Sequence, residues 1–302
     1  ENAVKILVTG ASGFIGKSMV ERLLAENHHV LGIVRQIKES KNSDNCRILS
    51  FDLRERGLPV NEKEIDVLIN LASMQPKNDS IRLESYYESN VKIVENLCQL
   101  AEEKKIKQFI HVSTTSVYGP NLNLERLTEV STLDPQTPYG LTKHLGEEVL
   151  RIFSNSSRHD IQSCVLRFPS VFGRNQKGGL VDYFYSLAKK NEDINIYNQG
   201  KSYRNLLYIS DAVESICKCL RIRGKLNKFE TFVIGSSNSL NTLEIAKLIV
   251  SKLNSDSSLI PVRKESNREG DILLDCSKAK TKLKFFPLTI EEGIDLYLKS
   301  LL

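Results

Sequence analysis

The chain has 302 residues, of which 40% are apolar, and a formal net charge of +5. This length allows a full core or two lobes, and no run approaches 18 apolar residues, which excludes a helical membrane span. Lysine and arginine are spread along the sequence without a dense basic stripe, so we expect no nucleic-acid partner. The positive excess indicates either a solvated surface or a local pocket for a phosphorylated ligand.

The six cysteines are scattered, without a C-x-x-C pair or histidines at metal-ligand spacing. Small secreted domains that depend on disulfides carry a higher density of cysteine. We therefore expect reduced thiols, a cytoplasmic location and no metal site. The five histidines have no partner at ligand spacing either, so we expect solvated or core roles for them.

The first half of the chain alternates short apolar runs with stretches of helical periodicity. The predicted strands are Val4–Val8, Val30–Val34, Arg47–Phe51, Val67–Leu71, Phe109–Ser113 and Ser163–Phe168, and the predicted helices are Ile15–Glu26, Tyr87–Lys104 and Tyr139–Ser154. The strands are rich in β-branched residues or leucine and alternate little, which is typical of strands buried on both faces. The pattern predicts an α/β fold with a doubly wound parallel sheet of Rossmann type.

Each of the two later helices carries an apolar stripe at helical spacing. The stripes are Val91, Val94, Cys98 and Ala101 in one helix, and Leu141, Leu145, Val149 and Ile152 in the other. We expect each stripe to be the side that packs on the sheet.

The segment TGASGFIG, Thr9 to Gly16, closes the first predicted strand and opens the first predicted helix. Its glycines, Gly10, Gly13 and Gly16, allow a tight turn and a close approach of the backbone to a pyrophosphate, whose charge then faces the free amides of the helix start. The segment predicts a dinucleotide-binding site, and a tight strand–helix turn without a ligand is the alternative.

Three further positions lie where the rest of a dinucleotide is expected. Arg35 follows the second strand, where an acidic residue would hold the ribose of NAD, and an arginine there can receive the 2′-phosphate of NADP. Arg35 therefore favours NADP, with NAD as the open alternative. Asp52 ends the third strand and can accept from the adenine amino group. Asn70 to Ser73 end the fourth strand close to the expected ribose.

Tyr139 and Lys143 stand four residues apart at the start of a predicted helix. A tyrosine with its ordinary pKa of about 10 is a poor base, and bringing that pKa near 7 requires about 4 kcal/mol of phenolate stabilisation. A lysine one turn away lies on the same helix face, and its charge favours the phenolate. Upstream, the segment Ser113 to Gly119 supplies hydroxyl groups at the carboxyl end of a strand, where open α/β sheets bind ligands.

Six ordered segments resemble motifs of the extended short-chain dehydrogenase/reductases of the nucleotide-sugar epimerase/dehydratase family. TGASGFIG resembles TGxxGFIG, and HVSTTSVYG resembles the strand with the catalytic Ser or Thr. PYGLTKHLGEE resembles PYxxSK, and LRFPSVFG resembles LRxxNVYG. YRNLLYISDA is similar to QRDFVYVDDVA, and NREGD is similar to the RPGD segment. The resemblance covers nearly the whole chain.

The resemblance implies a role for several residues. Thr114 would hydrogen-bond the reacting oxygen, Tyr139 would transfer the proton, and Lys143 would lower the pKa of Tyr139 and hold the nicotinamide ribose. Arg204 and Arg268 fall on positions that grip the nucleotide diphosphate, a task that suits the planar donors of arginine. The expected substrate contacts are Ser116, Ser170, Arg204 and Arg268. The expected cofactor contacts are Gly10, Gly13, Phe14, Ile15, Gly16, Arg35, Asp52, Leu53, Leu71, Ala72, Ser73, Asn90, Tyr139, Lys143 and Phe168.

The chain departs from the family pattern at four places. Thr115 and Ser116 stand where the 4,6-dehydratases carry Asp and Glu, and eliminating water needs that acid and base, so we do not expect dehydration. Ser170 replaces a frequent Asn, Asn205 replaces an Asp, and Arg35 replaces the acid typical of NAD enzymes.

After Phe168 the alternation of strands and helices becomes irregular. We expect a dinucleotide-binding domain in residues 1–168, with residues 205–235 returning to it. Residues 169–204 and 236–302 are expected to form a smaller α/β C-terminal lobe that binds the substrate.

The leading hypothesis is an NAD(P)-dependent epimerase acting at sugar carbon 4 of a nucleotide-diphosphate sugar. The alternative is an NADPH-dependent reductase of a nucleotide 4-keto-sugar. Two lesser hypotheses are a non-catalytic NADP-binding sensor or scaffold and a reductase of another ketone or aldehyde. We also expect a homodimer, since family members often pair through the helices placed here at Tyr87–Lys104 and Tyr139–Ser154.

Overall fold

The computed structural model describes residues 3–37, 42–60, 64–76, 82–263 and 270–302. The chain divides into two compact units. The first unit comprises residues 1–117, 135–167 and 213–232, and the second comprises residues 118–134, 168–212 and 233–302.

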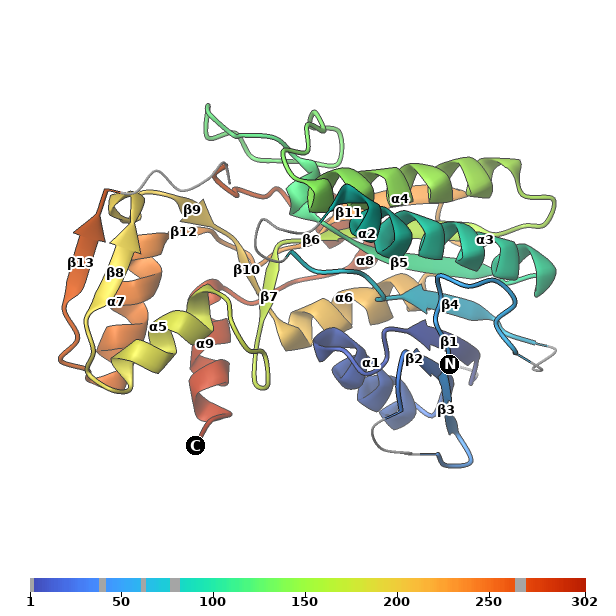
Figure 1. Cartoon of the computed structure of the whole chain (residues 1–302), viewed down its shortest axis with the longest axis horizontal. Coiled ribbons are helices and arrows are strands. Elements are labelled where there is room, and N and C mark those ends of the chain that lie inside the picture. Colours follow the sequence, from blue (N-terminus) through green and yellow to red (C-terminus); the bar gives the residue numbers. More distant parts are fainter. Residues whose placement is uncertain (1–2, 38–41, 61–63, 77–81, 264–269) are drawn as a thin grey trace. The chain divides into compact units, whose positions relative to one another are not determined.

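The first unit contains a seven-stranded parallel sheet with the strand order β11-β6-β5-β4-β1-β2-β3 (Figure 1). Its strands are β1 (Lys5–Thr9), β2 (His29–Val34), β3 (Cys46–Ser50), β4 (Val67–Asn70), β5 (Gln108–Thr114), β6 (Gln162–Phe168) and β11 (Phe229–Val233). The direction of winding reverses between β1 and β4, as in a doubly wound sheet. The predicted fold class is confirmed, and each of the six predicted strands ends within one residue of the observed bounds.

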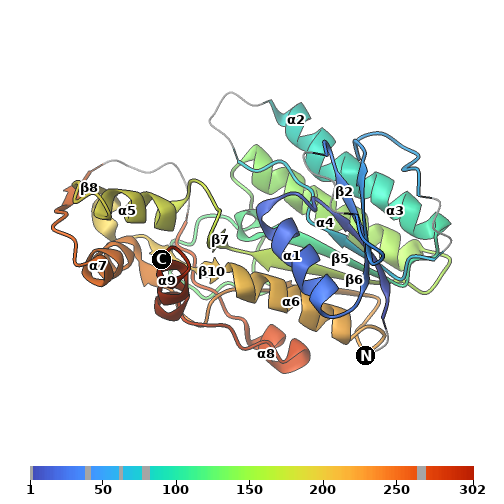
Figure 2. The same ribbon diagram turned by 90° about the horizontal axis from the view of Figure 1, so that it is seen from below.

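Helices cover both faces of this sheet (Figures 1 and 2). On one face lie α2 (Leu83–Tyr87), a π-helical turn η1 (Glu88–Lys92), α3 (Ile93–Glu103) and α4 (Pro138–Ser156), and on the other lie α1 (Phe14–Ala25) and α6 (Ile209–Arg221). The predicted helix at 87–104 is thus helical but interrupted near its start. Its apolar stripe is buried as predicted, with Val91, Val94, Cys98 and Ala101 at most 5% exposed.

The predicted inner face of α4 is wrong at three of its four residues, whereas Val149 is partly buried and packs against the core. Leu141, Leu145 and Ile152 are 37%, 37% and 58% exposed. The buried face carries Leu150 together with glycines and the charged side chains of Lys143 and Glu147, and the glycines let the helix approach its neighbours closely. A Cβ on Gly146 would lie 2.7 Å from the carbonyl oxygen of Asn90. A periodicity rule that looks for leucine therefore selects the outer face.

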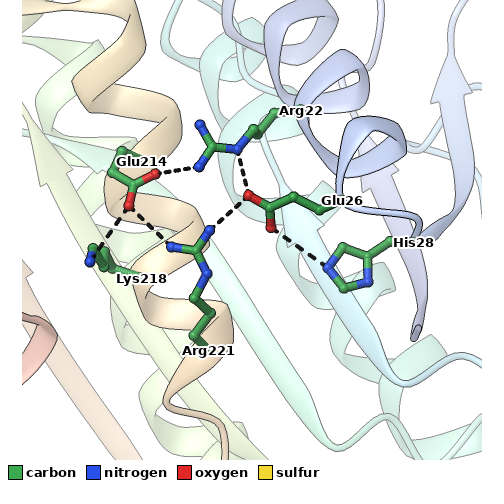
Figure 3. Close-up of polar contacts among 6 residues, drawn as sticks. All are labelled: Arg22, Glu26, His28, Glu214, Lys218 and Arg221. Carbon is green, nitrogen blue, oxygen red and sulfur yellow. Dashed lines mark hydrogen bonds and ion pairs between the residues drawn. The ribbon is translucent and has the colours of Figure 1, made fainter. Parts of the chain in front are cut away.

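Helices α1 and α6 are joined by a network of ion pairs (Figure 3). Glu26 accepts from Arg22 at 2.5 Å and from Arg221 at 2.7 Å, and Glu214 accepts from Arg22 at 2.8 Å and from Arg221 at 3.1 Å. Lys218 and His28 extend the network at 3.7 and 3.9 Å. Because each carboxylate is shared by both arginines, the network couples the two helices more firmly than separate surface pairs would.

The second unit consists of short strand pairs and helices. β7 (Ser170–Phe172) pairs with β10 (Leu206–Tyr208), β8 (Ile194–Tyr197) with β13 (Leu259–Val262), and β9 (Tyr203–Arg204) with β12 (Leu240–Asn241). Its helices are α5 (Leu180–Ala188), α7 (Thr242–Leu253), α8 (Ser277–Leu283) and α9 (Ile290–Lys299), and its short 3₁₀ turn is η3 (Asn198–Gly200). A separate core, which includes Phe172, Phe184, Ile245 and Ile294, supports these elements.

Candidate active site

The glycine-rich turn after β1 has the geometry that a phosphate cradle needs. Gly10 has φ of +66°, and a Cβ there would lie 2.9 Å from the backbone nitrogen of Ala72. A Cβ on Gly16 would lie 2.0 Å from the carbonyl oxygen of Gly10. Gly13 donates its amide to Gly10 at 2.9 Å and precedes α1, whose first turn, in the described chain, has neither a side-chain cap nor an acidic residue. The amides of Phe14 and Ile15 at the helix start are thus suited to an anionic ligand.

The loop after β4 packs directly on this turn. The Ala72 amide donates to Thr9 Oγ1 at 3.3 Å and to Asn70 Oδ1 at 3.2 Å. Leu71 lies against Gly10 through its backbone, and Ser73 Oγ accepts from Gln75 Nε2 at 2.9 Å. Our expected contacts in this loop, Leu71 to Ser73, thus lie beside the glycine turn. Sequence reasoning did not single out Thr9.

The end of β3 carries a compact charged pair. The Arg54 guanidinium donates to both carboxylate oxygens of Asp52, with Nη2 at 2.5 Å from Oδ2. The side-chain hydrogen bond from Arg54 lowers the pKa of Asp52 to about 2, and Arg35 acts in the same direction. Arg35 is exposed just past β2. Leu53 is buried, and its carbonyl accepts from Asn96 Nδ2 at 2.9 Å. Arg54 and Asn96 were missed, because neither belongs to a recognisable motif.

Asn90 links the β4 loop to α4. It lies in the π-helical turn, accepts from the Met74 amide at 2.8 Å and donates to Thr142 Oγ1 at 3.1 Å. π-Helical turns are rare and often lie at functional sites, because the extra residue turns a side chain away from the regular helix face.

Thr114, Tyr139 and Lys143 come together at the end of β5. The α4 helix begins at Pro138 with Thr137 as its cap, which accepts from the Gly140 amide at 3.0 Å. A Cβ on Gly140 would lie 2.2 Å from the carbonyl oxygen of Ser116, so this glycine brings the helix start against the turn after β5.

These three side chains are buried, at 8%, 8% and 2% exposure for Thr114, Tyr139 and Lys143. Lys143 Nζ donates to the Val112 carbonyl at 2.7 Å, and Thr114 hydrogen-bonds the Tyr139 side chain. Exposed Ser116 accepts from Thr114 Oγ1 at 3.2 Å, and its amide donates back at 3.1 Å.

Burial shifts both titratable groups towards their neutral forms. It raises the pKa of Tyr139 to about 12, with the hydrogen bond from Thr114 acting to lower it and Tyr86 acting to raise it. Burial also lowers the pKa of Lys143 to about 8, and the Glu147 carboxylate opposes that change. Lys143, which was expected to lower the pKa of Tyr139, is not among the groups that shift it.

The remaining expected residues belong to the second unit. Phe168 is buried and Ser170 is exposed. Arg204 Nη1 donates to the carbonyls of Tyr203 and Gly270 at 3.2 and 3.3 Å. Arg268 lies outside the described residues.

Asn205, which replaces a family Asp, has a structural task. Its Nδ2 donates to the carbonyls of Ser236 and Asn238 at 3.2 and 2.9 Å, and its Oδ1 accepts from the Ser236 amide at 2.9 Å. An ionised aspartate could accept but not donate, so the amide suits this position.

Among the residues that the structure describes, neither a metal cluster nor a membrane helix is found. The described residues contain no group of three or more His, Cys, Asp or Glu side chains that could hold a metal ion. Within the same residues, no helix combines the length and apolar character required to span a bilayer.

Comparisons with known proteins cover nearly the whole chain. Residues 6–235 match the sequence model of the NAD dependent epimerase/dehydratase family. The chain is 29% identical to an uncharacterised UDP-glucose epimerase of Bacillus subtilis over 99% of both chains, and 26% identical to a putative UDP-glucose 4-epimerase of Methanocaldococcus jannaschii over 96% of this chain and 95% of that protein.

Two solved structures share the fold. UDP-glucose 4-epimerase of Thermotoga maritima, solved with UDP-glucose, has a TM-score of 0.85 at 23% identity and 98% coverage of both chains. UDP-glucuronic acid 4-epimerase of Bacillus cereus, solved with UDP-glucuronic acid and NAD, has a TM-score of 0.84 at 24% identity, with 99% of this chain and 100% of that chain covered.

Proposed function

The chain belongs to the NAD-dependent epimerase/dehydratase family, and from that premise we propose that it is a nucleotide-sugar epimerase acting at carbon 4 of the sugar. The observation that carries the proposal is the buried group of Thr114, Tyr139 and Lys143 at the carboxyl end of β5. A sensor or scaffold on the same fold has no need of a proton-transfer group, so the site favours an enzyme.

We assign the cofactor to the first unit. The glycine turn and the uncapped start of α1 suit the pyrophosphate. We assign the adenine to Asp52 and Leu53, and the ribose to the loop after β4. Arg35 favours NADP, whereas the NAD in the structure of the Bacillus cereus epimerase favours NAD.

We assign the substrate to the second unit, with Arg204 and Arg268 on the diphosphate and Ser170 beside it. The Bacillus subtilis and Methanocaldococcus jannaschii relatives and the Thermotoga maritima structure are named for UDP-glucose, so we propose a UDP-sugar as the substrate. Thr115 and Ser116 lack the carboxyl groups that water elimination needs, so we do not propose a dehydratase.

In the proposed reaction, Tyr139 takes the proton of the 4-hydroxyl and later returns it to the 4-keto oxygen. A bound nicotinamide cofactor would supply the hydride chemistry at carbon 4, and inversion requires the hydride to return to the opposite face of the 4-keto sugar. Thr114 would hold the reacting oxygen, and Lys143, whose Nζ donates to the Val112 carbonyl, would hold the cofactor ribose. A positioned proton donor contributes a factor of about 10² to 10⁴ to the rate.

One experiment separates the epimerase from the reductase. The purified protein is denatured, the released nucleotides are identified by mass, and fresh protein is incubated with UDP-glucose, UDP-glucuronic acid and UDP-N-acetylglucosamine. We expect bound cofactor and conversion of one sugar into its 4-epimer without net consumption of NAD(P)H. Stoichiometric oxidation of NADPH by a 4-keto-sugar, without interconversion, would overturn the epimerase proposal in favour of the reductase.

A Tyr139→Phe variant tests the assignment of the proton donor. We expect this variant to fold and its turnover rate to fall by a factor of about 10² to 10⁴. Tyr87→Phe, at a tyrosine that is 40% exposed on α2, is the matched control and should retain turnover. Full activity in Tyr139→Phe would contradict the assigned role.

We further propose a homodimer that forms through the outer face of α4. Leu141, Leu145 and Ile152 expose an apolar stripe there, and Leu83 and Tyr87 on neighbouring α2 are 49% and 40% exposed. Burying this surface against a second copy would remove it from water. The six cysteines are all buried free thiols, which supports a reducing, cytoplasm-like compartment.

A further inference from the structure

Three polar side chains form a row across adjacent strands of the first unit. Thr9 on β1 is in register with Asn70 on β4, and Asn70 is in register with His111 on β5. Their side chains are fully buried, at 0%, 1% and 1% exposure. The row lies where β1 and β4 end, directly before the glycine turn and the β4 loop. Because an unpaired polar group is costly inside a protein, the position of each proton in this row determines which groups are paired.

The backbone determines the direction of every hydrogen bond in the row. The Ala72 amide donates to Asn70 Oδ1 at 3.2 Å, and Thr9 Oγ1 donates to the same oxygen at 2.6 Å. Since a backbone amide can only donate, the Asn70 oxygen faces Ala72 and its NH₂ group faces His111. The distance from Asn70 Nδ2 to His111 Nδ1 is 3.0 Å. An amide NH₂ cannot accept, so these directions place the ring proton of neutral His111 on Nε2, which is buried and has no hydrogen-bond partner among the described residues.

We propose that the Thr9–Asn70–His111 row is a tautomer lock that holds His111 neutral beside Lys143, so that His111 does not become a second cation next to the catalytic lysine. His111 is a positioning residue in this proposal, and its importance for turnover rests on the proposed epimerase function. The same row holds the Ala72 amide, so it ties the cofactor-side loop to the strand that anchors Lys143.

The surroundings of Lys143 explain why a second cation there would matter. On its own helix Lys143 interacts with the Glu147 carboxylate, on β5 its charge acts on His111 and its Nζ donates to the Val112 carbonyl, and Glu147 is paired with Arg167 on β6. Burial and the charge of Lys143 hold the pKa of His111 well below its ordinary value. Both the hydrogen-bond directions and the surrounding charge thus favour the same neutral ring.

The lock is tested first in the wild-type protein by NMR of ¹⁵N-labelled histidine, with the His111 signals assigned by their loss in His111→Gln. We expect one protonated nitrogen, Nε2, and one unprotonated nitrogen, Nδ1, unchanged from pH 6 to pH 8. A proton on Nδ1, or titration near the ordinary pKa of about 6.5, would overturn the proposal. This readout needs neither substrate nor turnover, so it is independent of whether the chain is an epimerase.

Asn70→Asp tests the cause of the lock. The carboxylate still accepts from Thr9 and Ala72 but cannot donate to His111, so we expect it to draw a proton onto Nδ1. The imidazolium that results would repel the Lys143 ammonium group, so we expect the alkaline loss of activity to move to lower pH by about one pH unit. Asn195→Asp, which makes the same change at an exposed position on β8 of the second unit, is the control and should retain the wild-type spectrum and pH profile.

A folded Asn70→Asp protein whose His111 still carries its only proton on Nε2 would show that Asn70 does not set the tautomer, and the proposal would fail. If Asn70→Asp does not fold, the wild-type spectrum decides. If the spectra follow the prediction while no UDP-sugar is epimerised, the lock stands and the proposed function fails.

Discussion

Glu147 on α4 and Arg167 on β6 form an ion pair inside the first unit, with side chains only 3% and 5% exposed. Arg167 Nη2 lies 2.7 Å from Glu147 Oε2, and Nε lies 3.2 Å from each carboxylate oxygen. Glu147 stands one helical turn beyond Lys143 and raises its pKa against the effect of burial. The pair therefore connects the stability of the fold with the charge of the candidate catalytic lysine.

Removing one partner of this pair should be costly. For Glu147→Gln we expect a loss of about 3 to 5 kcal/mol in the free energy of unfolding, because the buried Arg167 charge is left unpaired. Equilibrium unfolding in urea measures this loss in the free energy of unfolding. The double variant Glu147→Gln with Arg167→Met should be less destabilised than Glu147→Gln alone. If the double variant lost as much free energy of unfolding as Glu147→Gln and Arg167→Met lose together as single variants, the two residues would not act as a pair.

The pH dependence of stability should report the buried titratable groups. Burial lowers the Lys143 pKa to about 8 in the fold, below its ordinary value of 10.5. Between these values the unfolded chain binds the extra proton, so the contribution of Lys143 to stability rises with pH from about 8 to 10.5. Tyr139 acts in the opposite direction above pH 10, since its folded pKa is raised to about 12.

Urea unfolding of the wild type, Lys143→Met and Tyr139→Phe at pH 7, 8, 9 and 10 isolates the contribution of each group. From pH 8 to 10 the wild type should gain stability relative to Lys143→Met, while its difference from Tyr139→Phe stays constant. If the difference in stability between the wild type and Lys143→Met also stayed constant over this pH range, the pKa of the lysine would not be held near 8.

The glycine turn should tolerate no side chain. Gly10→Ala places a Cβ 2.9 Å from the Ala72 nitrogen, so we expect loss of NAD(P)H binding in a fluorescence titration. Gly224→Ala is the matched control, because Gly224 has φ of +78°, close to the +66° of Gly10, but has open space around its Cβ. Unimpaired binding in Gly10→Ala would exclude this turn as the pyrophosphate site.

Arg35 should decide between the two cofactors. A charge-assisted hydrogen bond contributes about 1.5 to 3 kcal/mol, so Arg35→Ala should weaken NADPH binding by roughly 10- to 150-fold and leave NADH binding nearly unchanged. Arg56→Ala, at another exposed arginine of the first unit, serves as the control. Equal losses for both cofactors, or none, would remove the argument for NADP.

The exposed α4 stripe should control the oligomeric state. Placing charges on it in Leu145→Glu and Ile152→Glu should turn a dimer into a monomer in light scattering coupled to gel filtration. Val130→Glu, at a residue that is 93% exposed in the second unit, should leave the dimer intact. A wild type that is monomeric at micromolar concentration would contradict the proposed dimer.

The sequence by itself determined the sheet and the positions of its motifs. The six predicted strands are rich in β-branched residues or leucine, and such runs are readable because strands buried on both faces are predominantly apolar. The glycine turn and the Tyr139–Lys143 pair are local in sequence, so their spacing alone predicted a helix start that carries both.

Only the tertiary structure decided which face of α4 is buried. Lys143 and Glu147 are inside and Leu145 is outside, because Gly140 and Gly146 bring the helix close to its neighbours and Arg167 compensates the buried carboxylate. Likewise, Thr9, Asn70 and His111 are separated by 61 and 41 residues and meet only through strand register. Hydrogen bonds between such distant residues leave no periodic trace in the sequence, so a histidine expected to have a solvated or core role proved to be part of a buried polar row.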